Sequence, residues 1–82
     1  MPEIKIDKVI DTKGLLCPMP VVKTKLALEE VEPGQVVQVL ATDPAAPKDF
    51  VAWCQETGNK LLKSGQEGKV FVLTIQKGQE PS

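Results

Sequence analysis

The 82-residue chain contains no histidine, no arginine and no tyrosine. Without histidine it has no imidazole general base, no Ser-His or Cys-His pair and no Cys/His zinc site. Without arginine it has no bidentate clamp for phosphate or carboxylate groups. The reactive side chains that remain are the thiols of Cys17 and Cys54, the carboxylates and the lysines. We therefore expect no metal site.

Basic charge and aromatic rings are also scarce. Ten lysines stand against eleven acids, for a net charge of −1, and the aromatic residues are Phe50, Trp53 and Phe71. A nucleic-acid-binding domain usually carries a basic excess and, for single strands, a set of stacking rings. The composition therefore argues against nucleic acid as a partner.

Long apolar runs are missing as well. No segment approaches the roughly 20 apolar residues of a membrane span, and the first residues lack the apolar region of a signal peptide. We expect a cytoplasmic protein without a membrane partner, in a compartment that keeps both cysteines reduced.

What is present is typical of one small folded domain. Apolar residues make up 41% of the chain and charged residues 26%, which is the balance of a globular protein. We expect a single domain over residues 1–82, with an ordered core over about 4–77 and a loose tail over 78–82.

Hydrophobic periodicity predicts six elements in the order β-α-β-α-β-β. The predicted strands are 4–10, 36–41, 59–64 and 70–75, the helices are 17–31 and 46–57, and two of the turns are 11–14 and 65–68. The two crossovers favour parallel strands, and the last hairpin is antiparallel. The predicted fold class is α/β, a two-layer sandwich with a four-stranded mixed sheet and both helices on one face.

Each helix has a predicted apolar face. The face of the first helix is expected to combine the pairs Val22/Leu26, Val21/Leu28 and Leu28/Val31. The face of the second helix is expected to combine Phe50, Trp53, Cys54 and Thr57, spaced i, i+3, i+4, i+7. Cys54 is thus expected in the core, where a free cysteine behaves as a small apolar residue.

Cys17 lies at or just before the start of the first helix, in the sequence Cys17-Pro18-Met19-Pro20. Proline is tolerated in a first helical turn, because its missing amide hydrogen has no partner there to lose. The unpaired amides and the positive end of the helix dipole stabilise a thiolate. We therefore expect Cys17 to be exposed and reactive, with a lowered pKa and with the Met19 amide as a donor to its sulfur.

Charged residues surround this cysteine in the predicted fold. Lys13 lies in the preceding loop, and Lys23 and Lys25 fall in the N-terminal half of the predicted helix. They either form a positive field and a docking surface for a partner or simply point to solvent. Asp43 follows the strand 36–41, so it lies at the same sheet edge as Cys17, where it either caps the second helix or braces the edge.

A thiol without histidine fits sulfur transfer better than acyl transfer. A protease or acyltransferase needs a proton for its leaving group, and no imidazole is present to supply it. A thiolate can instead attack the terminal sulfur of a partner's persulfide and then carry that sulfur, because a thiol leaves without acid help.

A wider motif surrounds Cys17: Asp11-x-x-Gly14-x-x-Cys17-Pro18-x-Pro20, then Gly34, Thr42-Asp43-Pro44 and Asp49. This pattern resembles the TusA/SirA family of sulfur carriers, and the resemblance covers about residues 8 to 76. It implies a fold like that of the C-terminal domain of translation initiation factor three. It also implies that the CPxP cysteine is the functional one, with a site shaped by Asp11, Gly14, Pro18, Met19, Pro20 and Asp43.

The resemblance implies a persulfide on Cys17 as the only cofactor, in a sulfurtransferase-type carrier that is expected to be a monomer. The sulfur donor would be a protein such as a cysteine desulfurase or a rhodanese, and the acceptor a DsrE-like protein. Members of the family serve tRNA thiolation, molybdenum-cofactor supply or sulfur oxidation. Two other functions stay open from the residues: an RNA- or protein-binding regulatory module without chemistry, and a redox protein that cycles a Cys17–Cys54 disulfide.

Overall fold

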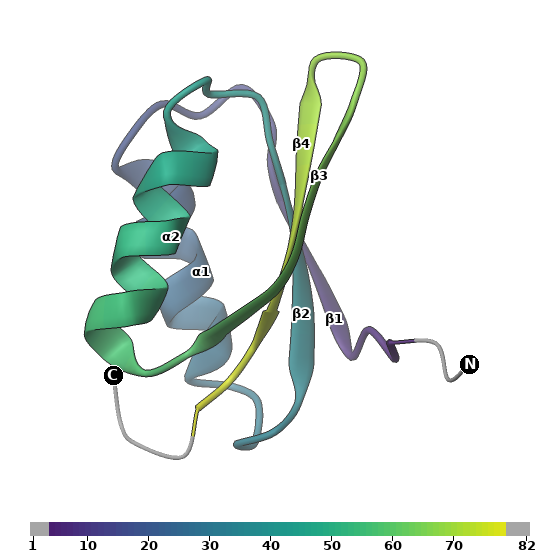
Figure 1. Cartoon of the computed structure of the whole chain (residues 1–82), viewed down its shortest axis with the longest axis vertical. Helices are drawn as coiled ribbons and strands as arrows, with labels where there is room; N and C mark the ends of the chain where they lie inside the picture. The colour runs from purple at the N-terminus through teal and green to yellow at the C-terminus, as the bar shows by residue number, and fades with distance from the viewer. Residues whose placement is uncertain (1–3, 79–82) are drawn as a thin grey trace.

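The computed structural model of the chain describes residues 4–78 (Figure 1). Its elements in chain order are β1 (Lys8–Thr12), α1 (Met19–Leu28), β2 (Val36–Ala41), α2 (Ala46–Thr57), β3 (Lys60–Glu67) and β4 (Val70–Gln76). The four strands form one sheet in the order β1-β2-β4-β3, and both helices lie on the same face of it. β1 is parallel to β2, whereas β4 is antiparallel to β2 and β3. The predicted two-layer α/β sandwich is confirmed.

The core lies between the helix layer and the sheet. Side chains of a strand alternate between the two faces of a sheet, and Val39 of β2 pairs with Leu73 of β4 on the face that the helices cover. Phe50 of α2 is fully buried against this layer, and its ring meets that of Trp53 edge-on at 6.0 Å between centroids. Cys54 belongs to the same buried cluster, in the place that its sequence spacing predicted.

The bounds of α2 coincide with the predicted helix. Gly58 follows the last turn with φ 81°, a left-handed conformation that favours glycine and ends the helix. Asn59 then fixes the chain after α2 with its side chain. Its Nδ2 donates to the hydroxyl of Thr57, and its Oδ1 accepts the backbone amide hydrogen of Gly78 at 2.8 Å. Gly78 is the first residue of the predicted loose tail, and the rest of that tail lies outside the described residues.

The predicted first strand over 4–10 is wrong in its bounds, since β1 spans Lys8–Thr12. The carboxylate of Asp7 accepts the Val36 amide hydrogen at 2.8 Å, so that amide is not free to extend the strand ladder. At the other end Thr12 stays in the strand, because its buried hydroxyl donates to the Leu40 carbonyl. The turn predicted to start at Asp11 therefore begins one residue after Thr12.

The predicted apolar face of α1 is wrong in one of its pairs. Val22 and Leu26 are exposed, whereas Thr24 is fully buried and Leu28 is in the core. Thr24 can be buried because its hydroxyl donates to the Pro20 carbonyl at 2.9 Å, which satisfies the polar group within the helix. The face of α1 that packs on the sheet is thus rotated around the helix axis relative to the predicted face.

The predicted end of α1 at Val31 is also wrong, because the helix ends at Leu28. The next amides turn tightly: the Glu30 amide donates to Ala27, and the Val31 amide donates to Leu28, three residues back in each case. This tighter spacing replaces the α-helical pattern at the end of the helix. Val31 still packs against the core from the following turn.

The turn predicted at 65–68 is placed too early. Gly65, Gln66 and Glu67 continue β3, and the hairpin reverses over Gly68 and Lys69. Gly68 has φ 62°, which is the positive value that the favoured two-residue hairpin turns require at their first central residue. Of the two glycines that bound the predicted turn, the one with positive φ marks the actual reversal.

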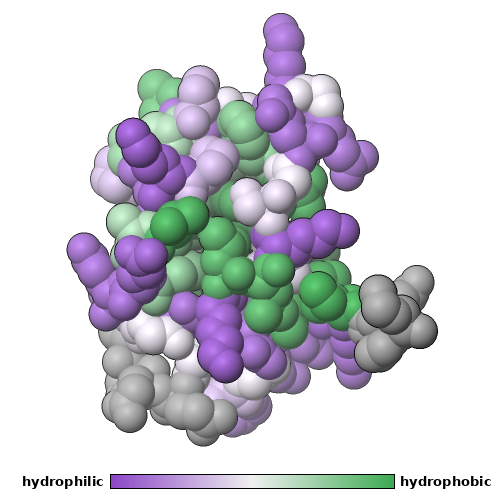
Figure 2. Space-filling view, in the orientation of Figure 1, coloured by the Kyte–Doolittle hydropathy of each residue, from purple (hydrophilic) through white to green (hydrophobic). Residues whose placement is uncertain are grey.

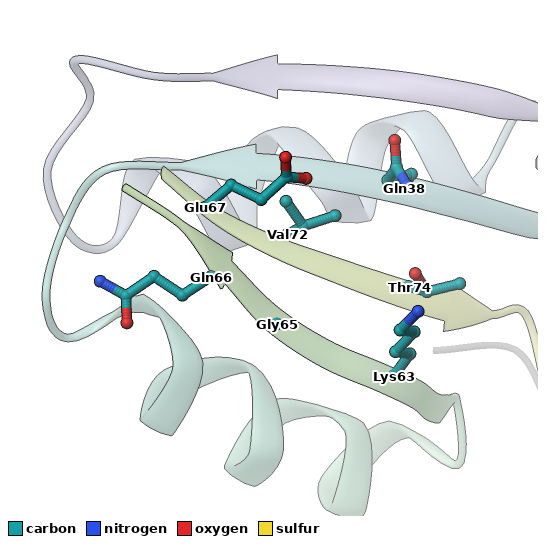
Figure 3. A pocket seen from close by; sticks show the side chains of 7 residues that line it. All are labelled: Gln38, Lys63, Gly65, Gln66, Glu67, Val72 and Thr74. Atoms are coloured by element: carbon teal, nitrogen blue, oxygen red, sulfur yellow. The ribbon is translucent and has the colours of Figure 1, made fainter. Parts of the chain in front are cut away.

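Among the described residues no helix covers the second face of the sheet, which is partly polar (Figure 3). A shallow pocket of about 310 Å³ lies on it, lined by residues from three strands that include Gln38, Lys63, Val72 and Thr74. Figure 2, which has the orientation of Figure 1, shows apolar surface across the middle of that view, with hydrophilic side chains around it. A thin domain leaves much apolar surface in solvent, so exposure alone does not mark a site.

Within residues 4–78, no helix has the length and apolar character that a membrane span needs.

Candidate functional site

Two loops meet at the edge of the sheet where the parallel strands β1 and β2 end. The Gly14 amide donates to the hydroxyl of Thr42 at 2.9 Å, and the Cys17 amide donates to Oδ2 of Asp43 at 2.6 Å. Gly14 has φ 85°, which lets the chain leave β1 sharply before it approaches the second loop. These two hydrogen bonds fix the segment that holds Cys17 against the start of α2.

Asp43 fills one of the two roles that the sequence left open, the bracing of the edge, because α2 has no side-chain hydrogen bond at its N-cap. Its Oδ2 binds the Cys17 amide, and its Oδ1 accepts the amide hydrogen of Ala45, the N-cap residue of α2, at 3.0 Å. The residue is buried, with 8% of its surface exposed. A carboxylate buried in this way is costly unless it is hydrogen-bonded, and both of its oxygens are. Asp43 therefore holds the loop of Cys17 and the start of α2 together at this edge of the sheet.

Cys17 itself is exposed and directly precedes α1, whose N-cap is Pro18. Pro20 lies in the first turn with its side chain buried, which anchors this end of the helix on the core. The predicted contact from the Met19 amide to the sulfur is wrong, because that amide donates to the Leu16 carbonyl at 2.9 Å. The thiol thus projects from a fixed backbone without a Met19 donor.

The predicted lowering of the Cys17 pKa is wrong in sign. Asp49, in the first turn of α2, is placed to accept a hydrogen bond from the thiol, and this is the main cause that raises the pKa of Cys17 above its usual value. Partial loss of solvent and the negative charges of Asp49 and Asp43 act in the same direction. The charged groups that act on this sulfur are therefore both carboxylates.

The lysines predicted to activate Cys17 act on another residue or lie elsewhere. Lys13 forms an ion pair with Asp11 at 3.0 Å, and its amide donates to the same carboxylate. These contacts and, more weakly, the charge of Lys23 hold the pKa of Asp11 below its usual value. Lys25 falls in the last turn of α1, where the negative end of the helix dipole favours it. The predicted position of Lys25 in the N-terminal half of the helix is therefore wrong.

An exposed row of apolar side chains, not predicted from the sequence, begins beside Cys17. We call it the α1 stripe, and it consists of Leu16, Met19, Val22 and Leu26. The last three are spaced i, i+3 and i+7, so they lie on one side of α1. Leu16 is the most exposed of them, at 71%. The helical spacing was visible in the sequence, but the same spacing fits a buried face equally well.

Cys54 lies deep in the fold, away from the edge that holds Cys17. It is the ninth residue of α2, about 12 Å along the helix from its first residue at a rise of about 1.5 Å per residue. Its side chain belongs to the buried cluster, and both cysteines are free thiols. The geometry therefore assigns exposed chemistry to Cys17 and packing to Cys54.

Burial raises the pKa of Cys54 to about 11, from an ordinary 9.0. The unfolded chain loses this proton near the ordinary value, whereas the folded chain keeps it until the higher one. The free energy of unfolding should therefore fall by about 2 kcal/mol as the pH rises from about 9 to about 11. Urea unfolding across this range measures the effect. Cys54→Ala should lack this part of the decline, and an equal decline in that variant would contradict the assignment.

Among residues 4–78 there is no group of three or more cysteine, aspartate or glutamate side chains that could hold a metal ion.

Comparisons with known proteins agree on one family. The family model described as "Sulfurtransferase TusA" matches residues 8–77. The chain is 44% identical over 71 residues to "Sulfur carrier protein TusA" of Allochromatium vinosum, covering 87% of this chain and 93% of that protein. It is 49% identical over 75 residues to YrkI of Bacillus subtilis, covering 92% of this chain and all of that protein.

A solved structure agrees with these sequence matches. The crystal structure of a SirA-like protein from Desulfitobacterium hafniense superposes with a TM-score of 0.76 at 30% sequence identity. The match covers 88% of this chain and 99% of that one. Since the family model spans nearly all the described residues and the fold agrees, the chain belongs to the TusA family.

Proposed function

We propose that this protein is a sulfur carrier that holds one sulfur atom as a persulfide on Cys17. The observation that supports this best is an exposed thiol on a backbone that Asp43 fixes from a neighbouring loop. Within the described residues, Cys54 is the other thiol, and it is buried. The TusA family of the chain includes a relative named as a sulfur carrier.

The transfer step needs no group that the chain lacks. The Cys17 sulfur attacks the terminal sulfur of a donor persulfide, forms a new S–S bond, and breaks the S–S bond of the donor. The thiol proton of Cys17 ends on the donor's cysteine sulfur, so the donor leaves as a thiol and Cys17 becomes the persulfide. No electrons are gained or lost overall, and no histidine is required. Delivery to an acceptor thiol repeats the same exchange in the forward direction.

The surface around Cys17 offers a place for the donor and the acceptor. The α1 stripe runs from Leu16, next to Cys17 in the sequence, to Leu26, and Leu26 also lines a groove of about 360 Å³ between β1 and α1. Lys23 lines this groove. Exposed Lys25 lies on the same helix, and exposed Lys13 lies in the loop that precedes it. Apolar surface rimmed by charges suits a transient protein contact.

The partners are proposed by class. We propose a cysteine desulfurase or a rhodanese as the donor and a DsrE-like protein as the acceptor, in tRNA thiolation, molybdenum-cofactor supply or sulfur oxidation. The cytoplasmic location and the monomeric state expected from the sequence stay predictions.

The test is to load the protein with a persulfide donor, remove the donor, and measure sulfane sulfur by its conversion of cyanide to thiocyanate. The expected result is one sulfane sulfur per chain, which a reducing thiol removes. Treatment of Cys17 with iodoacetamide before loading should abolish the signal. Loading that survives this alkylation would contradict the proposal.

A further inference from the structure

We propose that two copies of this chain associate reversibly through the β1 edge of the sheet and the adjoining side of α1, as a dimer with two-fold symmetry. The two β1 strands pair antiparallel, so that the sheet of one copy continues into the sheet of the other. The inference goes beyond the proposed function, because it concerns the unloaded chain and involves no sulfur. The monomer expected from the sequence is then the form of the dilute protein.

The two edges of the sheet differ in how well they accept another strand. β3, at one edge, has a register shift between Leu61 and Lys63, and a bulge with exposed lysines hinders strand addition. β1, at the other edge, keeps a continuous register over Lys8–Thr12, and among the described residues it pairs with β2 alone. The edge at β1 is therefore the one open to a further strand.

The outward backbone groups of β1 belong to Val9 and Asp11. The Lys77 amide donates to the Gln35 carbonyl, so Gln35 and every second residue after it in β2 face β4. The residues between them face β1, and in the observed parallel register they bond the even-numbered residues of β1. The amides and carbonyls of Val9 and Asp11 therefore point away from the sheet, where a second strand can bond them.

The described part of the chain before β1 leaves this edge clear. Ile4 and Ile6 line a small pocket together with Gln38, Lys63 and Thr74, which lie on the second face of the sheet. Residues 4–6 therefore cross that face instead of the outer side of β1. On the helix side, α1 lies over the β1 half of the sheet and α2 over the β3 half (Figure 1). A strand added at β1 would thus meet α1.

The charges beside this edge complement each other across a two-fold axis. The groove between β1 and α1 is lined by residues that include Lys23, Leu26 and Glu30. Glu30 forms an ion pair with Lys8 at 2.6 Å, so it lies level with the start of β1. Lys23 lies about 10 Å back along the helix, toward the end of β1.

Antiparallel pairing of two β1 strands about Ile10 places the start of one strand beside the end of the other. This register bonds Val9 of each copy with Asp11 of the other. Lys23 of each copy also comes to the level of Glu30 of the other, which gives two equivalent ion pairs. Leu26, exposed in the single chain, lies near the axis and meets its counterpart. One patch thus supplies both halves of a self-complementary interface.

The contact is expected to be weak. β1 has five residues and is about 17 Å long, so the contact is smaller than the roughly 800 Å² per partner of a standard interface. We expect a dissociation constant of about 0.1 mM. Lys23 and Leu26 also belong to the surface proposed for the sulfur donor and acceptor. A sulfur partner docked there would displace the second copy.

The first test is sedimentation equilibrium of the unloaded full-length protein with a reducing agent, from about 10 µM to about 1 mM. We expect monomer at the low end and dimer at the high end. Lys23→Glu should raise the dissociation constant about five- to tenfold, because like charges then face each other twice across the axis. Glu30→Lys should act likewise, and the double variant, which exchanges the two charges, should return close to the native value.

Lys63→Glu is the matched control. It reverses an exposed lysine on the other edge strand and changes the net charge by the same amount as Lys23→Glu. It should leave the dissociation constant unchanged. A chain that stays monomeric at about 1 mM, or a dimer that Lys23→Glu and Lys63→Glu weaken equally, would overturn the inference.

Amide hydrogen exchange followed by NMR locates the contact. Exchange of the Val9 and Asp11 amides should slow as the protein is concentrated from about 10 µM to about 1 mM, whereas exchange in β3 should not change. A dimer in which the Val9 and Asp11 amides exchange as fast as in the monomer would contradict the proposed edge. These measurements use no sulfur donor, so their outcome is separate from success or failure of persulfide loading.

Discussion

Asp43→Ala is expected to lower the free energy of unfolding by about 2–4 kcal/mol. The carboxylate is buried and accepts two amide hydrogens, from Cys17 at 2.6 Å and from Ala45 at 3.0 Å. A hydrogen bond to a charged group contributes about 1.5–3 kcal/mol, and removing the acceptor leaves two partly buried amides without a partner. A domain of this size has a total stability of about 4–12 kcal/mol, so the loss is a large share of it.

Denaturant unfolding measures this loss, and amide hydrogen exchange of Cys17 and Ala45 locates it. Asp43→Asn is the matched variant, because it keeps one acceptor oxygen and should lose less. Asp11→Asn removes an exposed carboxylate near the end of β1 and should cost less still, since exposed ion pairs contribute little. An Asp43→Ala protein with native stability and protected amides would show that Asp43 does not brace the edge.

Cys17→Ser is expected to abolish sulfur loading completely, whereas Cys54→Ser should load as the native protein does. A hydroxyl cannot form a stable persulfide, and Cys17 is the exposed thiol of the described chain. Cys54 is buried at 5% exposure, so a persulfide donor cannot reach it in the folded state. The mass of the intact protein after incubation with the donor measures the gained sulfur.

The paired variants also separate the other functions that the sequence left open. A redox protein that cycles a Cys17–Cys54 disulfide would lose its activity in both variants. A binding module without chemistry would keep its partner in Cys17→Ser. Equal sulfur gain in Cys17→Ser and the native protein would refute the role of Cys17 as the carrier.

The helices and strands whose hydrophobic pattern has only one structural interpretation were predictable from the sequence. β2 is a run of β-branched and apolar residues between Gly34 and Thr42, and it forms where expected. The bounds of α2 also agree, because Phe50 and Cys54 share a buried face and Gly58 supplies the left-handed end. In both cases local propensity and burial favour the same structure.

Elsewhere a side-chain hydrogen bond decided the outcome. The start of β1 depends on the Asp7 side chain, which takes the Val36 amide from the ladder. The buried face of α1 depends on Thr24, which bonds within its helix and is buried while Val22 is exposed. Neither contact has a signature in the spacing of apolar residues.

The candidate site shows the same division. The position of Cys17 before a proline-containing helix and the position of Asp43 at the same edge follow from the motif and the strand order. The sign of the Cys17 pKa shift does not, because it depends on which charges face the sulfur. In the sequence Lys13 is close to Cys17 and Asp49 is distant from it. In the fold Lys13 pairs with Asp11, and Asp49 is the residue that acts on the Cys17 thiol.

The location of the added sulfur is the most direct test of a persulfide carrier. The native protein is loaded with a persulfide donor, its persulfide is blocked by alkylation, and its peptides are sequenced by tandem mass spectrometry. We expect one extra sulfur atom on the peptide that contains Cys17 and none on the peptide that contains Cys54. An extra sulfur on Cys54, or no covalent sulfur on either peptide, would contradict the assignment of Cys17 as the sulfur-carrying residue.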